Sequence, residues 1–314
     1  MTEIASDQFT CVEDFIEGLA TTKYIASRQI ATAIFLAQNL EKPVLVEGSA
    51  GVGKTELALA TAEMLDIPLI RIQCYEGLDE SKALYEWKYG KQLLYTQVLK
   101  DKIGVVLKEA DNIETAMDRL HGFTDVFFSE QFLEPRPLLK ALQEDTGAVL
   151  LIDEIDKANE EFEAFLLEIL SAFQVTIPEI GTVKANTPPT VFLTSNNTRD
   201  VGDALKRRCL HLHIPLPDAK LEEKIILTRI PDIDERLCRQ LVHFVQALRA
   251  LDIKKLPSIS ETIDWARAMV LLHAEVLDAE LIRETLNVLL KFEDDIVTVA
   301  PQINGLLREA VHMR

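Results

Sequence analysis

The stretch that decides the fold is residues 48–55, which read Gly-Ser-Ala-Gly-Val-Gly-Lys-Thr and fit the phosphate-loop pattern Gly-x-x-x-x-Gly-Lys-Ser/Thr in full. An apolar run at residues 43–46 precedes it, and a helix-forming run at residues 56–65 follows it. A loop between a strand and a helix points backbone N–H groups at phosphate oxygens, and the positive N-terminal end of the helix faces the same anion. The alternative, a glycine-rich turn with a chance lysine, is disfavoured because the required strand and helix flank the motif. The sequence therefore predicts nucleotide binding at this loop.

Each residue type in the loop has its own chemical role. The glycines allow the backbone to wrap tightly around the phosphates. The Lys54 ammonium would lie near the outer phosphates, and the Thr55 hydroxyl would supply one oxygen to a hexacoordinate Mg²⁺ ion. The residues expected to contact the nucleotide are Gly48, Ser49, Ala50, Gly51, Val52, Gly53, Lys54 and Thr55.

Length and composition are those of a globular protein. The chain has 314 residues, 48% of them hydrophobic, which suggests two domains. Its first thirty residues are acidic rather than basic and apolar, so they do not resemble a secretory signal. Apolar runs stay short of the roughly 18 residues of a membrane span. The four cysteines lie singly, which argues against a disulfide framework or a zinc site and favours free thiols in a cytoplasmic protein.

The net charge of −18 bears on the partners of the chain. A strongly acidic surface repels a phosphate backbone, so nucleic acid is an unfavourable partner. A local basic channel inside an acidic assembly stays open as an alternative.

The order of elements predicts an α/β fold with a parallel sheet. Residues 11–40 have helical spacing, residues 67–72 form a second short strand, and the next apolar run comes at residues 148–152. The long interval between the strand at 67–72 and the apolar run at 148–152 predicts added elements within residues 75–146, including a helix at 109–120. Its aromatic stripe of Tyr85, Trp87 and Tyr89 either contacts a partner or, as we favour, packs on the core.

In the later part of the chain, the sequence pattern changes from mixed helices and strands to helices alone. Residues 159–173 place their apolar side chains on one helical face and Glu160, Glu161, Glu163 and Glu168 on a solvated one. A hairpin is expected at residues 174–184 and a strand at 190–194. After the prolines at 215–217 the pattern is helical only, at 219–228, 235–251, 261–276 and 280–292. We therefore expect an α/β domain at residues 1–217 and a small helical bundle at 218–314.

Acidic and amide side chains follow the predicted strands. Asp153 would hold the magnesium ion, and Glu154 would polarise the water that attacks the terminal phosphorus. An acidic helix start is the alternative for this pair, and the preceding apolar strand disfavours it. The Asn196 amide could bond the attacking water or a phosphate oxygen, or it could simply occupy a turn.

Two further groups of polar residues lie near the end of the α/β part. Lys206, Arg207 and Arg208 form either a solvated helix end or a cationic group that reaches the nucleotide of a neighbouring subunit. His211 and His213 share one strand face, but without a third ligand nearby a metal site is disfavoured.

With these residues in place, the chain resembles the AAA+ ATPases, and within them the MoxR-like group that includes the CbbQ, NorQ and GvpN types. The resemblance covers nearly the whole chain. Residues 48–55 look like Walker A, residues 149–154 like Walker B, and Thr194-Ser195-Asn196 is similar to sensor 1. It implies a P-loop NTPase αβα core with a central parallel sheet, followed by a small helical lid, and it implies ATP and Mg²⁺ as cofactors.

The resemblance also assigns residues outside these motifs. Arg208, with Arg207 in reserve, occupies the position of the arginine finger, and Tyr24-Ile25 falls where the family lines its adenine pocket. Sensor 2 departs from the pattern, because Ser260 stands where the family has arginine. Either Arg267 takes part instead, or the coupling of the lid to the nucleotide differs.

The resemblance implies a ring, commonly a hexamer, with ATP bound between subunits. MoxR-like proteins resemble chaperones that remodel or activate client enzymes, often with a von Willebrand factor A domain partner. The acidic composition favours a protein client over DNA. The alternatives are a DNA-associated AAA+ motor and an ATP-gated assembly module with little turnover.

Overall fold

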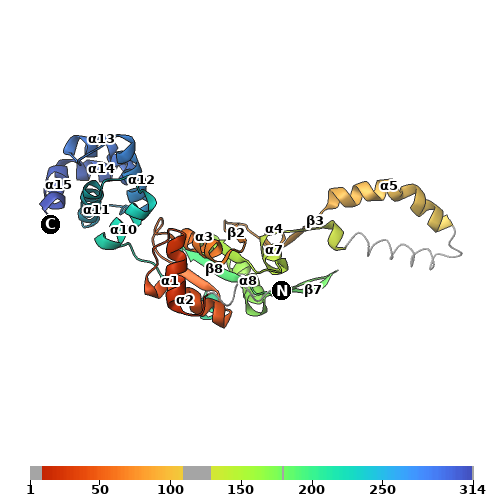
Figure 1. Cartoon of the computed structure of the whole chain (residues 1–314). Helices are drawn as coiled ribbons and strands as arrows, with labels where there is room; N and C mark the ends of the chain where they lie inside the picture. The colour runs from red at the N-terminus through yellow and green to blue at the C-terminus, as the bar shows by residue number, and fades with distance from the viewer. Residues whose placement is uncertain (1–8, 109–128, 179, 313–314) are drawn as a thin grey trace.

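The structure, a computed structural model, describes residues 9–108, 129–178 and 180–312. The α/β part runs to β9, and a helical region of α10 to α15 follows (Figure 1). The elements of the α/β part are α1 (Val12–Thr21), α2 (Arg28–Leu40), β1 (Val44–Glu47), α3 (Lys54–Leu65), β2 (Leu69–Gln73), α4 (Glu80–Ala83), β3 (Tyr85–Trp87), α5 (Tyr89–Lys108), β4 (Leu133–Pro135), α7 (Pro137–Gln143), β5 (Val149–Asp153), α8 (Glu160–Ala172), β6 (Gln174–Ile177), β7 (Gly181–Lys184), β8 (Thr190–Ser195), α9 (Asp203–Arg208) and β9 (Leu210–His213). The helical region contains α10 (Ala219–Arg229), α11 (Glu235–Arg249), α12 (Ile259–Leu271), α13 (Ala279–Leu289), α14 (Glu293–Val299) and α15 (Ile303–His312).

A parallel sheet is the centre of the α/β part. Its strand order within the described residues is β2-β5-β8-β1-β9, and every pair in it is parallel. The register pairs Gln73 with Asp153 and Glu47 with Ser195, so the carboxyl ends of neighbouring strands meet at one edge. The phosphate loop leaves β1 at this same edge. The predicted αβα fold with a central parallel sheet is confirmed.

Both faces of the sheet are covered by helices, which explains why its inner strands read as continuous apolar runs. Val149 and Leu151 of β5 pack with α1, α2 and α3, whereas Leu150 and Ile152 of the same strand pack with α7 and α8. All five residues of β5, including Asp153, are buried. The carboxylate of Asp153 therefore needs hydrogen-bond donors from neighbouring elements.

The helical region has its own apolar core, centred on Trp265 and Phe244. A buried ion pair joins two of its helices, because Arg249 donates to both carboxylate oxygens of Glu222 at 2.7 and 2.8 Å. This two-point geometry satisfies charges that burial would otherwise penalise. Helices α14 and α15 complete the core and extend the set of helices that the sequence predicted.

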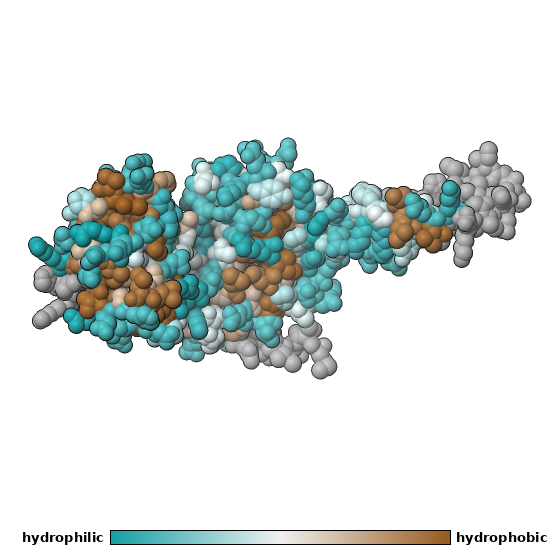
Figure 2. All heavy atoms as spheres, turned by 90° about the horizontal axis from the view of Figure 1, so that it is seen from above, coloured by the Kyte–Doolittle hydropathy of each residue, from teal (hydrophilic) through white to brown (hydrophobic). Residues whose placement is uncertain are grey.

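Two antiparallel ribbons are added to the core. β6 pairs with β7 between Gln174 and Lys184, and β3 pairs with β4 at the base of α5. Figure 1 shows α5 projecting beyond the sheet, on the side away from the helical region. Leu93, Leu94 and Val98 on this helix are exposed, and Figure 2 shows a brown, hydrophobic patch on the arm. The helix predicted at residues 109–120 lies outside the described residues.

The aromatic stripe at the start of this arm divides into two parts. Tyr85 and Trp87 are half-buried, pack against the core and contact each other with ring centroids 5.8 Å apart. Tyr89 is 64% exposed. Core packing therefore accounts for the first two rings and leaves the third at the surface.

One prediction about helix α8 was wrong. Glu163 is buried rather than solvated, and its carboxylate accepts hydrogen bonds from Arg199 and from the Gly202 N–H. These donors lie in the segment after β8, about forty residues along the chain, so helical periodicity could not reveal them. The four cysteines are free, as expected, with Cys74 and Cys238 buried. Among the described helices, none combines the length and the apolar character that crossing a membrane requires.

Candidate functional site

The phosphate loop joins β1 to α3 and has a backbone that only glycine adopts easily. Gly51 has φ of 77° and Gly53 has φ of 97°, both in the left-handed region. A Cβ atom on Gly48 would lie 2.4 Å from the carbonyl oxygen of Ile214, and one on Gly51 would lie 2.1 Å from Ser258 Oγ. The loop is therefore held between the end of the sheet and the N-terminus of α12.

Lys54 links this loop to the end of β8. Its buried ammonium donates to the carbonyl oxygens of Gly48 at 2.7 Å and Ser49 at 2.9 Å, and to Asn196 Oδ1 at 2.8 Å. Burial lowers the pKa of Lys54 from its usual value, and the nearby carboxylates of Asp156, Asp153 and Glu154 oppose this shift. The ammonium is thus surrounded by oxygen acceptors at the mouth of the loop, where phosphate oxygens would be equivalent acceptors.

Asp153 collects donors from three elements. Its Oδ1 accepts from Thr194 Oγ1 at 2.5 Å and from Thr55 Oγ1 at 3.2 Å, and its Oδ2 lies 2.5 Å from Arg71 Nη2. The structure therefore brings together the two residues expected to bind magnesium, and their hydroxyl and carboxylate oxygens are the hard ligands that Mg²⁺ prefers. Arg71 was not predicted, because only the pairing of β2 with β5 places it beside Asp153.

Glu154 is held at the same edge by three side chains. Its Oε2 accepts from Gln73 Nε2 at 2.7 Å and from Lys157 Nζ at 2.6 Å, and its Oε1 accepts from Asn196 Nδ2 at 3.2 Å. Its φ of 58° is rare for a residue with a side chain and is typical of a functional position. Gln73 and Lys157 were missed by the sequence analysis, since neither belongs to a recognisable motif.

Two adjoining cavities lie on either side of the phosphate loop. The first, about 330 Å³, is lined mainly by polar residues, among them Lys54, Asp153 and Glu154. The second, about 160 Å³, is apolar and takes residues from both parts of the chain, including Tyr24, Ile25, Ile214, Leu221, Ile225, Ile259 and Ile263. Gly51, Gly53, Glu56 and Ser260 line both cavities. This arrangement fits a nucleotide whose phosphates occupy the polar cavity and whose base occupies the apolar one.

Tyr24 and Ile25 lie in the apolar cavity, where the adenine pocket was expected. Burial raises the pKa of the Tyr24 hydroxyl, and the neighbouring Glu56 carboxylate adds to this shift. The Tyr24 ring also approaches the loop, because a Cβ on Gly53 would lie 3.8 Å from it. Tyr24 is therefore a neutral, apolar wall of the cavity.

The structure keeps the arginine-finger candidates apart from this site. Arg207 and Arg208 occupy the last turn of α9 and are exposed, and their side chains form no ion pair or hydrogen bond within the described part of the chain. Neither lines the two cavities. His211 lies 2.7 Å from Glu47 Oε2, and no group of three or more metal-ligating side chains occurs in the described part of the chain.

Ser260, which stands at the expected sensor 2 position, contacts the phosphate loop. The N–H and Oγ of Ser260 both donate to the Gly51 carbonyl oxygen, at 3.2 and 3.0 Å. Arg267 is exposed, lies 3.4 Å from Asp264 and lines neither cavity. Arg229 of α10, which the sequence analysis did not single out, does line the apolar cavity and pairs with Glu56 at 2.5 Å.

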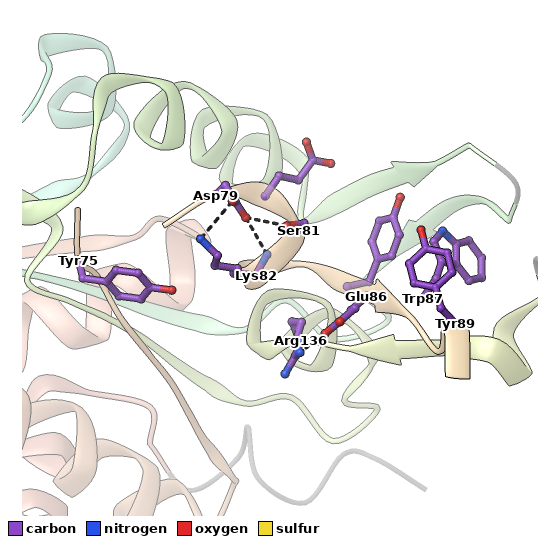
Figure 3. Close-up of a pocket in the computed structure, with 10 residues that line it drawn as sticks. Tyr75, Asp79, Ser81, Lys82, Glu86, Trp87, Tyr89 and Arg136 are labelled. Atoms are coloured by element: carbon purple, nitrogen blue, oxygen red, sulfur yellow. Dashed lines mark hydrogen bonds and ion pairs between the residues drawn. The ribbon is translucent and has the colours of Figure 1, made fainter. Parts of the chain in front are cut away.

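A larger cavity, about 970 Å³, lies away from these residues at the base of the α5 arm. Its lining includes Tyr85, and Figure 3 shows Tyr75, Trp87 and Tyr89 around it together with Glu86 and Arg136, which form an ion pair. It contains none of the residues predicted from the motifs. The aromatic cavity and the phosphate-loop site are therefore separate features.

Comparisons with known proteins agree with the geometry of the site. Residues 43–209, more than half of the chain, match the family model described as AAA domain (dynein-related subfamily). Uncharacterized proteins of Staphylococcus aureus, strains NCTC 8325 and USA300, are each 26% identical to the chain over 246 residues, which span 76% of this chain and 79% of theirs.

Two solved structures align with most of the chain at low sequence identity. A RuvB variant of Thermotoga maritima has a TM-score of 0.46 and 15% identity, covering 96% of this chain and 79% of its own. A candidate ATPase of Cytophaga hutchinsonii has a TM-score of 0.46 and 15% identity, covering 97% of this chain and 96% of its own.

A substitution in the loop tests whether its backbone forms the site. Gly51→Ala forces a side chain into a left-handed conformation and against Ser258, a strain of about 1–3 kcal/mol, so ADP binding should weaken by about 5–150-fold. The dissociation constant of a fluorescent ADP derivative measures this. Gly305→Ala is the matched control, because an added methyl there meets open space. Wild-type affinity in a folded Gly51→Ala protein would exclude the loop as the phosphate site.

Proposed function

Because the chain belongs to the AAA domain family of the dynein-related subfamily, we propose that it is an ATP-hydrolysing remodelling enzyme of the MoxR-like type that acts on a protein client. The observation that carries this proposal is the meeting of Lys54, Asp153, Glu154 and Asn196 around one polar cavity beside the phosphate loop. These residues come from one helix and the ends of two strands, and only the fold brings them together.

Each of these residues has its own role in the proposed hydrolysis. Lys54 would exchange its carbonyl acceptors for the outer phosphate oxygens of ATP, and Thr55 with Asp153 would hold Mg²⁺. The metal, when bound, neutralises charge on the phosphates. Glu154 accepts the proton of the attacking water as that oxygen bonds to the terminal phosphorus and the bond to ADP breaks.

The Asn196 amide is hydrogen-bonded to both Lys54 and Glu154. Its Oδ1 accepts from the Lys54 ammonium, while its Nδ2 donates to the Glu154 carboxylate. One amide therefore contacts both the group that binds the terminal phosphate and the group that binds water. This geometry supports a role for Asn196 in aligning water with the phosphorus.

We further propose that the active form is a ring of identical subunits, a hexamer as in MoxR-like proteins. Arg208, or Arg207 beside it, would reach the nucleotide of the next subunit. Support comes from their exposure and from their position outside the cavities of their own chain. A cation supplied by a neighbour stabilises the charge of the transition state.

We base the proposed client and partner on the net charge of the chain and on its resemblance to MoxR-like proteins. With a net charge of −18, the chain is better suited to a protein client than to nucleic acid. A von Willebrand factor A domain protein is the partner that we propose would connect the ring to this client.

Glu154→Gln tests the assignment of the base. The amide keeps the size of the side chain but loses the negative charge and one accepting oxygen, so it cannot take the water proton. Turnover should fall by about 10²–10⁴-fold while ATP binding persists. Phosphate release and the affinity for a fluorescent ATP derivative measure the two quantities. Undiminished turnover would remove Glu154 from the mechanism.

The same variant tests the remodelling role. Because a ring that binds ATP without hydrolysing it should stay closed on its client, tagged Glu154→Gln protein should retain specific proteins with ATP and release them with ADP. Mass spectrometry of both eluates identifies them, and Lys54→Ala is the control that cannot bind the phosphates. Identical protein sets from the ATP and ADP samples would contradict a client-remodelling function.

Mixed assemblies test whether Arg208 acts in trans. Arg208→Ala and Lys54→Ala proteins should each be inactive, whereas mixing them creates interfaces that pair an intact phosphate loop with an intact arginine. Phosphate release should recover to a peak near equal proportions. Should no ratio of the two proteins recover activity, the arginine would have to act elsewhere, and Arg207→Ala in the same mixture would test its neighbour.

A further inference from the structure

Two side chains of the helical region, Ser260 and Arg229, make polar contacts with the phosphate loop and its helix. Ser260 donates to the Gly51 carbonyl oxygen, and Arg229 pairs with Glu56 in the first turn of α3. The serine contact is uncharged and ends on the loop backbone. The second contact is an ion pair, so it is the one that an added negative charge in the site would perturb.

Arg229 lies on the wall of the apolar cavity and pairs with a residue that lines both cavities. Its side chain is 29% exposed, and it lines the apolar cavity together with Gly51 and Gly53 of the phosphate loop. Its partner Glu56 lines both cavities. Among the described residues, Lys23 is the other cation on the wall of the apolar cavity, but it belongs to the α/β part. Arg229 is thus the cation that the helical region brings to this cavity.

Electrostatics make the Arg229–Glu56 pair sensitive to the nucleotide. The Glu56 carboxylate stands in the first turn after Thr55, so phosphates in the adjoining cavity would add negative charge beside it. Two anions would then compete for one guanidinium, whose planar fork matches phosphate oxygens as well as a carboxylate. Phosphate carries the larger charge and is therefore the stronger competitor.

We propose that Arg229 is a nucleotide-contacting residue that leaves Glu56 for a phosphate group when the nucleotide binds. This inference rests on the proposed nucleotide site and adds to it a cationic contact from α10, in a chain that has Ser260 at the sensor 2 position. Because Arg229 lies in the last turn of α10, its partner determines what this end of the helix is held against. The exchange therefore couples the helical region to phosphate occupancy.

The competing explanation is a static link, in which the ion pair only ties the helical region to α3. The two explanations predict opposite effects for Glu56→Gln. If Arg229 exchanges partners, removing the carboxylate frees the guanidinium, and ADP should bind more tightly. If the pair is a static link, Glu56→Gln and Arg229→Gln should weaken binding alike.

The experiment compares the dissociation constants of ADP and adenosine by calorimetry for the wild type, Arg229→Gln, Arg229→Lys and Glu56→Gln. We expect Arg229→Gln to weaken ADP binding by about tenfold and adenosine binding by less than about twofold, because only ADP carries phosphate. Arg229→Lys should fall between, since it keeps the charge without the fork. Glu56→Gln should tighten ADP binding by about threefold or more. Arg267→Gln is the matched control, because this exposed arginine of α12 lines neither cavity.

Several results would overturn the proposal. Equal losses for ADP and adenosine would place Arg229 at the base or in the fold, and parallel losses in Arg229→Gln and Glu56→Gln would establish the static link. Unchanged ADP affinity in Arg229→Gln would show that no contact forms. Turnover has no part in the comparison, so a failure of the hydrolysis proposal leaves it intact. A wild-type protein that binds neither ligand would overturn both.

Discussion

The buried carboxylate of Asp153 is the group on which the arrangement of the site depends. A charge at the end of a fully buried strand is costly unless donors surround it. Thr194 comes from β8, Thr55 from the first turn of α3 and Arg71 from β2, so one carboxylate ties together both neighbouring strands and the helix after the phosphate loop. The same donors and acceptors fix where a divalent cation and a phosphate would lie.

The second organising constraint is the close contact between the phosphate loop and the helical region. Gly51 has no room for a side chain because Ser258 lies against it, and its carbonyl oxygen is an acceptor for Ser260. The apolar cavity exists only because α10 and α12 close over the α/β part. A nucleotide base in this cavity would therefore contact both parts of the chain.

Much of the site was predictable because its motifs are local. The turn at Gly48–Thr55 needs glycines at fixed spacing, and an apolar strand that ends in Asp153-Glu154 places its acids at the sheet edge. Lys54 and Asn196 were predicted separately and prove to be hydrogen-bonded. Gln73, Arg71 and Lys157 were not found, because their significance depends on which strand neighbours which and on a turn at Glu154.

The sequence by itself determined the α/β class, the phosphate loop, the acidic strand end and the helical character of the last third, because each depends on residue type and spacing over a few turns or one strand. Tertiary structure alone decided the strand order β2-β5-β8-β1-β9, the burial of Glu163 and the pairing of Arg229 with Glu56. These contacts join residues far apart in the chain. Their formation depends on packing and on the cost of leaving a charge unpaired, which no local pattern records.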